Sequence, residues 1–200
     1  MSDYAEVWAA ARPYMRARKN DVHIPLSYWY AERLLERHPE ADADVVLLAI
    51  MFHDAGWAVI DEERIFREGF ATGDGEVDLA SDVRILHEKE GARLAAEALG
   101  GMWDVAIVDE VVAIIDGHDS RLHALSRNDE LVKDADKLWR LTPHGVDMVM
   151  DWFGLTRDEA HRLIGGRVHD QLCTDAARTM ARALAAVARV DTLPQRVALG

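Results

Sequence analysis

The sequence predicts an all-α protein. Alanine and leucine, which favour helices, are abundant along most of the chain, and apolar residues recur at steps of three and four. No segment shows the alternation of apolar and polar residues that indicates a β-strand. The chain has 200 residues, of which 50% are hydrophobic, and it contains no internal repeat or low-complexity linker. We therefore expect a single domain that spans residues 1–200.

The first three helices follow from the apolar spacing. The first two are expected over residues 3–18 and 22–37. Pro25 falls in the first turn of the second helix, where a missing N–H group is tolerated. Asp42 or Asp44 can cap a third helix, which continues through "VVLLAIMFHDAG" and ends near Gly56.

The segment after this helix has no helical period. Residues 57–80 contain Gly69, Gly73 and Gly75. We expect a long surface loop here, with a helical turn over residues 61–67. Loops of this length often act as lids over a functional site.

Helices resume in the second half of the chain. They are expected over residues 82–99, 104–116, 129–141, 157–165 and 171–190, with a loop at 117–128. Gly100 and Gly101 end the first of these helices, and Asp104 can cap the second. Thr156 and Glu159 have the spacing of a capping box before the fourth.

The charge of the chain limits its partners. The formal net charge is −13. A nucleic-acid duplex or an anionic membrane surface needs a basic face, so neither is expected as a partner. A small anionic substrate stays compatible with the sequence, because local cations or metal ions can override the overall sign.

The sequence also points to a cytoplasmic protein. Its first residues, "MSDYAEVWAA", lack the pattern of a secretory signal, and its longest apolar runs are too short to span a membrane. Cys173 is the only cysteine, which excludes an intramolecular disulfide and a thiolate metal cluster.

Histidine and aspartate residues beside apolar stretches suggest a metal site. They are His23, the pair His53-Asp54 in "IMFHDAGW", His87, His118, and Asp134 or Asp136 in "LVKDADKLW", with His123 as a weaker candidate. Different predicted helices supply these groups, and helices of a bundle can direct such side chains to one interior point. Any one of these histidines alone is more often a core or surface residue than a metal ligand. Together, imidazole and carboxylate ligands suit Mn, Fe, Co, Ni or Zn, and the two oxygens of Asp54 could bridge two ions.

The order of these residues resembles the HD-domain superfamily, which is named for its adjacent His-Asp pair. The family pattern is a first His, the His-Asp pair, in some members two further histidines, and a late Asp. This pattern matches His23, His53, Asp54, His87, His118 and Asp136. The segment "DADKL" is similar to the closing segment of the family and favours Asp136 over Asp134. The resemblance covers an HD-type core of about residues 20–140 and leaves a C-terminal helical extension of about 142–192 outside it.

The resemblance implies a metal-dependent phosphohydrolase that acts on a nucleotide or small phosphate ester through a metal-activated hydroxide. Members with both additional histidines often bind two ions, commonly Fe or Mn, although Co, Ni, Zn or Mg are also possible. In this interpretation the first ion is held by His23, His53, Asp54 and Asp136. His87, His118 and a bridging Asp54 hold the second.

The resemblance also has departures. Trp57 stands where several mononuclear nucleotidases of the family carry a catalytic Glu, and no Lys closely follows the His-Asp pair. Cations for a phosphate must therefore come from elsewhere, and the candidates are Arg84, Lys89, Arg121, Lys133, Lys137 and Arg140. Arg121 and Lys137 are the preferred catalytic cations beside Asp54. Asp119 could support His118 or cap the loop.

Two other functions are compatible with the same ligands. Some members of the superfamily are di-iron oxygenases that cleave C–C or C–P bonds and use the same ligand order. Tyr28, Tyr30 and the 57–80 loop could close the pocket of such an enzyme. The third alternative is a non-catalytic metal-binding module that retains the ligands for stability.

Overall fold

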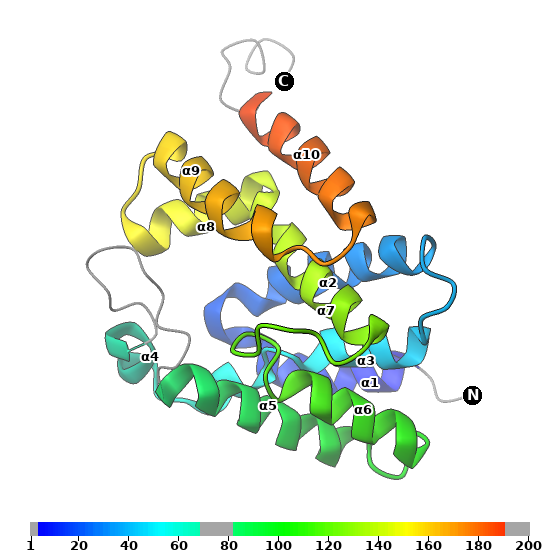
Figure 1. The fold of residues 1–200 in the computed structure, drawn as a ribbon. Coiled ribbons are helices and arrows are strands. Elements are labelled where there is room, and N and C mark those ends of the chain that lie inside the picture. The colour runs from blue at the N-terminus through cyan, green and yellow to red at the C-terminus, as the bar shows by residue number, and fades with distance from the viewer. Residues whose placement is uncertain (1–3, 69–81, 191–200) are drawn as a thin grey trace.

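The computed structural model shown in Figure 1 describes residues 4–68 and 82–190. All regular elements in these ranges are helices, and no strand occurs among them, which confirms the all-α class. The α-helices are α1 (Tyr4–Ala11), α2 (Asn20–Leu35), α3 (Ala43–Phe52), α4 (Glu62–Glu68), α5 (Asp82–Leu99), α6 (Val105–Ile115), α7 (Arg127–Leu138), α8 (Pro143–Phe153), α9 (Arg157–Val168) and α10 (Asp175–Val190). Short 3₁₀ helices are η1 (Arg12–Lys19), η2 (Ala55–Val59), η3 (Trp139–Leu141) and η4 (His169–Gln171).

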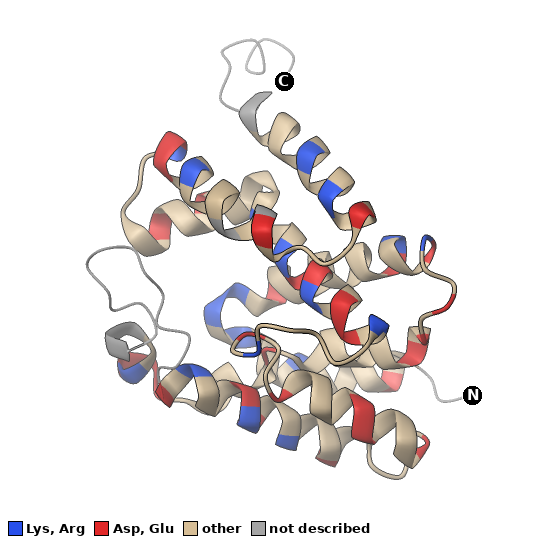
Figure 2. Cartoon of the chain, viewed as in Figure 1, with Lys and Arg blue, Asp and Glu red and all other residues tan. Residues whose placement is uncertain are grey.

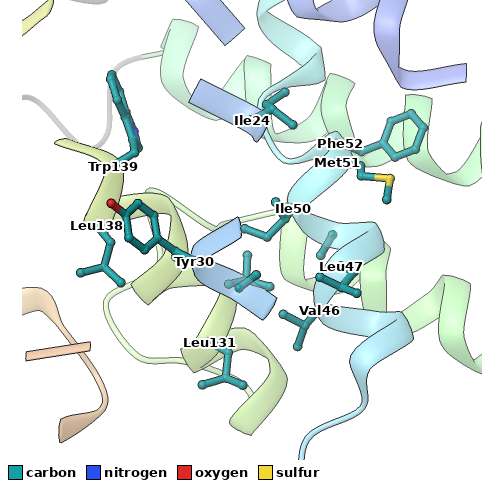
Figure 3. Close-up of a cluster of buried hydrophobic side chains, with 14 of the residues drawn as sticks. Ile24, Tyr30, Val46, Leu47, Ile50, Met51, Phe52, Leu131, Leu138 and Trp139 are labelled. Atoms are coloured by element: carbon teal, nitrogen blue, oxygen red, sulfur yellow. The ribbon is translucent and has the colours of Figure 1, made fainter. Parts of the chain in front are cut away.

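Helix α3 lies at the centre of the fold. Its residues from Val45 to Phe52 are all buried, as expected for a helix that is apolar on every side. It packs against α2, α5, α6 and α7. Figure 3 shows Ile24, Ile50 and Leu131, from α2, α3 and α7, among the side chains of this core. The elements that carry the candidate ligands therefore all pack around α3.

Side chains cap several of the predicted helix starts. The Asp42 carboxylate accepts hydrogen bonds from the backbone N–H groups of Asp44 and Val45, so Asp42 is the cap of α3. Asp104 caps α6 in the same way, as predicted. Ser126 caps α7, which therefore begins before the predicted residue 129.

The helix predicted over residues 3–18 is not continuous. It ends at Ala11, and the following 3₁₀ segment is kinked at Ala17 and Arg18. Arg18 and Lys19 have left-handed backbones with φ of 51° and 60°. This conformation is costly for residues other than glycine, and it is commonest at functional sites.

The third helix ends earlier than Gly56. Helix α3 stops at Phe52, His53 caps its C-terminus, and Asp54 precedes η2. At Gly56, a Cβ atom would lie 2.0 Å from the carbonyl oxygen of His87, so only glycine allows η2 to approach α5 this closely. Of the loop predicted over 57–80, residues 62–68 form α4, while residues 69–81 and any lid they form lie outside the described residues.

Helix α8 was not predicted, and His144 lies in its first turn. Pro143 is compatible with this position because the first turn needs no N–H donor. The Thr142 hydroxyl accepts a hydrogen bond from the Gly145 N–H group, and Gly154 ends the helix in a left-handed conformation. The residues that begin and end this helix, Thr142 with Pro143 and Gly154, are thus of the types that typically mark helix ends.

Helices α8 and α10 lie in Figure 1 beside α7, away from α5 and α6, and α10 contacts α7 directly. Figure 2 shows basic and acidic residues interspersed along α5 and α7. Within residues 4–68 and 82–190, every helix is too short or too polar to cross a membrane.

Candidate metal centre

Two candidate ligands are oriented by the helices that precede them. His53 and His118 follow α3 and α6, and each imidazole Nδ1 lies within hydrogen-bond distance of a carbonyl three residues earlier. The distances are 2.8 Å to Ile50 O and 3.0 Å to Ile115 O. A carbonyl only accepts, so Nδ1 carries the proton in both rings. In the neutral imidazole, Nε2 then keeps its lone pair for a metal ion.

One group of ligand atoms comes from α2, α3 and α7. His23 Nε2 lies 2.9 Å from His53 Nε2 and 3.2 Å from Asp136 Oδ1. His53 Nε2 lies 3.5 Å from the same carboxylate oxygen. All three side chains are buried. The structure therefore brings together three of the four ligands predicted for the first ion.

A second group faces it from α5 and the end of α6. His87 Nε2 and His118 Nε2 are 3.4 Å apart. Asp54 Oδ1 lies 3.7 Å from the former and 3.6 Å from the latter. These are the three ligands predicted for the second ion.

Asp54 lies between the two groups. Its Oδ2 atom is 4.0 Å from His23 Nε2 and 3.9 Å from His53 Nε2, whereas Oδ1 faces His87 and His118. Asp54 is held at its backbone and at its side chain, since Asn20 donates a hydrogen bond to the Asp54 carbonyl and Trp57 donates one to Oδ1. One carboxylate thus presents a different oxygen to each histidine pair.

The two carboxylates of the cluster are ionised, and His53 holds a proton that a metal ion would have to displace. Burial raises the pKa of Asp54 and of Asp136, but the histidines and Arg140 nearby outweigh it and hold both pKa values well below the usual range. Burial lowers the pKa of His23 and, with the charge of His118, brings the pKa of His87 to about 3. Burial also opposes the charge on His53, but Asp54 and Asp136 raise its pKa to about 9. A metal ion would replace the proton that these carboxylates favour.

The donor atoms fit one or more divalent metal ions. Ligands about 2.1 Å from a common ion lie about 3.0–3.4 Å from one another in octahedral or tetrahedral geometry. The separations of 2.9, 3.2, 3.4 and 3.5 Å are of this size. Three groupings of described residues have ligand atoms close enough to hold an ion: His23, His53 and Asp136; His53, Asp54 and His118; and His87, His118 and Asp119.

The structure separates the two aspartates that the sequence left as alternatives. The Asp134 carboxylate accepts hydrogen bonds from the backbone N–H groups of Cys173 and Thr174, at 2.6 and 2.9 Å, and from the Thr174 hydroxyl at 2.7 Å. It therefore holds the start of α10. Asp136 instead reaches His23 and His53.

The two cations preferred from the sequence are engaged away from the ligand cluster. The Arg121 guanidinium donates to the carbonyls of Ala113 and Ile114 at the end of α6. Lys137 Nζ lies 3.4 Å from the carbonyl of Lys133, one turn earlier on α7. Neither contact supports a catalytic role, which stays a prediction for both residues.

Three arginines lie closer to the cluster. Arg84 pairs with Asp119 at 2.9 Å, and Arg140 lies 3.9 Å from Asp136. Arg18 was not predicted, because "RARK" has the composition of an ordinary basic surface segment. Its guanidinium lies 4.3 Å from the centroid of a Trp57 ring. Burial lowers the pKa of Arg18 to about 10, and Asp54 and Asp119 oppose this change, so Arg18 is cationic at neutral pH.

The loop that carries His118 is held from two sides. Glu88 accepts hydrogen bonds from the backbone N–H groups of Asp119 and Ser120 and from the Ser120 hydroxyl. Lys133 Nζ donates to the carbonyls of Gly117, His118 and Arg121, at 3.3, 2.7 and 3.1 Å. Glu88 and Lys133 are both buried, so they fix the position of His118.

Other predicted residues take structural or peripheral positions. Lys89 and His123 are exposed, and His123 belongs to none of the ligand groups. Tyr28 packs edge-on against Trp8, and Tyr30 is buried in the core seen in Figure 3. These contacts are those of ordinary packing.

Comparison with known proteins agrees with this geometry. The family model of the HD domain matches residues 23–141, which span every residue of the ligand cluster. Neither the curated proteins nor the solved structures gave a significant match. HD domains form a metal-dependent, hydrolase-type superfamily that binds divalent metals, and the His/Asp groups described above could hold such an ion. Because the matched segment covers more than half of the chain, the protein belongs to the HD domain family.

Proposed function

We propose that the protein is a phosphohydrolase with a two-ion metal centre, which acts on a nucleotide or a small phosphate ester. The observation that carries this proposal is the position of Asp54. Its Oδ2 atom faces His23 and His53, and its Oδ1 atom faces His87 and His118. A carboxylate placed in this way can bridge two divalent ions, such as Fe or Mn.

The arginines near the cluster support an anionic substrate. Arg18, Arg84 and Arg140 all interact electrostatically with one or more of Asp54, Asp119 and Asp136. Guanidinium groups bind phosphate oxygens through paired hydrogen bonds, and a partly buried site strengthens those bonds. Each arginine could bind a phosphoryl group by giving up part of its interaction with a carboxylate.

The residues divide the work of such a reaction. His23, His53 and Asp136 would hold one ion, His87 and His118 the other, and Asp54 both. Bound divalent ions lower the pKa of a coordinated water and polarise a phosphoryl oxygen. The arginines would orient the phosphate and balance its charge, while Ile50 and Ile115 keep two histidines in the tautomer that offers Nε2.

The proposal is tested with metal-free protein reloaded with Mn²⁺ or, without oxygen, with Fe²⁺. Phosphate release is measured on a panel of nucleotides and phosphomonoesters, with Asp54→Ala as the control for contaminating phosphatases. We expect about two ions per chain, and release from at least one compound that the control does not attack. If no compound is hydrolysed and the Fe form instead consumes oxygen with a substrate, the protein is an oxygenase of the same superfamily and the proposal is wrong.

A further inference from the structure

Trp57 contacts two of the three residues of the second ligand group, Asp54 and His87. Its indole N–H donates a 3.0 Å hydrogen bond to Asp54 Oδ1, the oxygen that faces His87 and His118. Its ring stacks on the His87 imidazole with a centroid separation of 4.0 Å and an angle of 12° between the planes. The Trp57 side chain is only 2% exposed, so solvent does not compete for these contacts.

His87 needs such a contact more than the other ligands do. Its Nδ1 atom is buried and has no hydrogen-bond partner within the described residues. His53 and His118 differ, because a backbone carbonyl holds each Nδ1. The stacked indole covers one face of the His87 ring, and the His118 imidazole lies edge-on to it at 5.1 Å between centroids, so the indole helps to fix the ring plane in place of a polar partner at Nδ1.

The local backbone places the indole against His87. Gly56 brings η2 against the backbone of α5 at the His87 carbonyl, and Trp57 is the next residue. The Arg18 guanidinium also packs on the Trp57 indole, and it lies 5.1 Å from the centroid of a Trp152 ring. Trp57 is thus held in one orientation by its backbone and by its neighbours.

We propose that Trp57 is a positioning residue for the second metal ion. It orients Asp54 through a hydrogen bond and His87 through stacking. This inference rests on the two-ion centre proposed above. Partners that orient metal ligands in this way typically contribute about 10–100-fold to metal affinity. Because Trp57 binds the Asp54 oxygen that faces His87 and His118, we expect it to affect the second ion more than the first.

The chain offers a matched control in Trp139. It is 1% exposed and lies edge-on against His23, at 4.6 Å between centroids, but its indole N–H has no acceptor among the described residues. Trp57→Phe and Trp139→Phe each remove a buried indole of the same size. Only the former removes a hydrogen bond to a ligand.

The experiment titrates metal-free protein with Mn²⁺ by calorimetry and measures bound metal by elemental analysis. In Trp57→Phe we expect about 10-fold weaker binding of the second ion and a smaller change for the first, and in Trp139→Phe unchanged binding of the second. Equal second-ion affinity in wild type and Trp57→Phe overturns the inference and leaves the two-ion centre intact. A wild type that binds a single ion overturns both.

A measurement on the wild type covers the case in which Trp57→Phe does not fold. The chain has six tryptophans, whose indole N–H groups give separate NMR signals. During titration with Zn²⁺, one indole signal should shift mainly with the second equivalent, because the ion draws charge from the Asp54 oxygen that this N–H binds. If no indole signal responds to the second equivalent, Trp57 does not position that site.

Discussion

Asp134 and Asp136 lie two positions apart on α7, and their carboxylates serve different parts of the molecule. Asp136 Oδ1 lies 3.2 Å from His23 Nε2, whereas Asp134 holds the backbone N–H groups of Cys173 and Thr174 at the start of α10. The two residues therefore form a natural pair for separating metal binding from stability.

Asp136→Asn should strongly weaken binding of the first ion, because an amide oxygen is a poorer ligand than a carboxylate for these metals. Asp134→Asn should leave metal binding unchanged and lower the free energy of unfolding by about 1–3 kcal/mol, since it weakens buried hydrogen bonds. Elemental analysis and urea unfolding measure the two effects. If Asp134→Asn lost metal and Asp136→Asn kept it, Asp134 rather than Asp136 would be the metal ligand.

Metal stoichiometry should distinguish the shared ligand from the unshared ones. Asp54→Ala should reduce binding of both ions, because each oxygen of Asp54 faces a different histidine pair. His87→Ala should reduce the metal content from two ions to one, which His23, His53 and Asp136 retain. If His87→Ala still binds two ions, the second group is not a metal site. His123→Ala is the control, since His123 is exposed and belongs to none of the ligand groups.

Substrate binding should depend on Arg18 rather than on Arg121. Arg18→Met should raise KM for the phosphate substrate by about 10-fold, the effect of one lost charged hydrogen bond, with a smaller change in kcat. Arg121→Met should leave KM unchanged and reduce stability by about 1 kcal/mol, because its guanidinium holds the carbonyls of Ala113 and Ile114. Steady-state kinetics and thermal melting provide both readouts. The opposite pattern would support Arg121 as the substrate cation.

Glu88 should act on the second ion through the loop of His118. Glu88→Gln keeps the size of the side chain but replaces one carboxylate oxygen with an NH2 group. The two oxygens accept hydrogen bonds from the backbone N–H groups of Asp119 and Ser120 and from the Ser120 hydroxyl. We expect weaker binding of the second ion by about 10-fold and a lower melting temperature in the metal-free protein. Glu90→Gln, on the partly exposed part of the same helix, is the control. Equal metal affinity in the two variants would mean that the loop needs no such support.

The stability of the metal-free protein should be greatest near pH 6.5. The pKa of His53 is about 9 in the folded state, so its contribution is complete below pH 6.5 and is lost as the pH rises towards 9. The pKa of His87 is about 3 in the folded state. As the pH falls below 6.5, His87 therefore takes up a proton in the unfolded chain but not in the folded one, and stability is lost. The lowered pKa values of Asp54 and Asp136 add to the loss in acid.

Thermal melting between pH 5 and 9 measures this dependence. Bound metal should abolish the loss above pH 6.5, because an ion replaces the proton on His53. His53→Ala supplies the control, since it should show a smaller alkaline loss without any metal. The remainder comes from His118, because burial opposes its charge but hydrogen bonding to Asp54 outweighs burial and raises its pKa. A metal-free wild type whose melting temperature keeps rising up to pH 9 would contradict the protonation assigned to His53.

The sequence was sufficient for the helical class, because helix formation depends on short-range patterns. The ligand set came from the residue order that the chain shares with the HD-domain superfamily, and its binding of metal stays a prediction. Apolar spacing located α5 with both of its ends, and the order of histidines and aspartates identified residues that the fold brings within about 4 Å. Helix α8 was overlooked because Pro143 has the appearance of a helix breaker. The Thr142 cap shows instead that it begins the helix.

The cations could not be identified from the sequence, because proximity along the chain does not give direction. Arg121 is three residues from His118 but turns back to α6, and Lys137 is adjacent to Asp136 but its Nζ turns back to the Lys133 carbonyl on α7. Arg18, whose guanidinium packs on Trp57, lies where the backbone turns left-handed at Arg18 and Lys19. Arginine and lysine rarely adopt a left-handed backbone, so the sequence gives no sign of this turn.

The contact between Gly56 and α5 has a consequence for how the centre tolerates mutation. A Cβ atom at Gly56 would lie 2.0 Å from His87 O and 2.7 Å from Gly91 N, so main chain meets main chain at this point. The spacing between the His53-Asp54 pair and His87 is therefore set by backbone atoms. Side chains elsewhere in the core can change size over evolutionary time without altering that spacing, whereas any side chain at residue 56 would push the two halves of the centre apart.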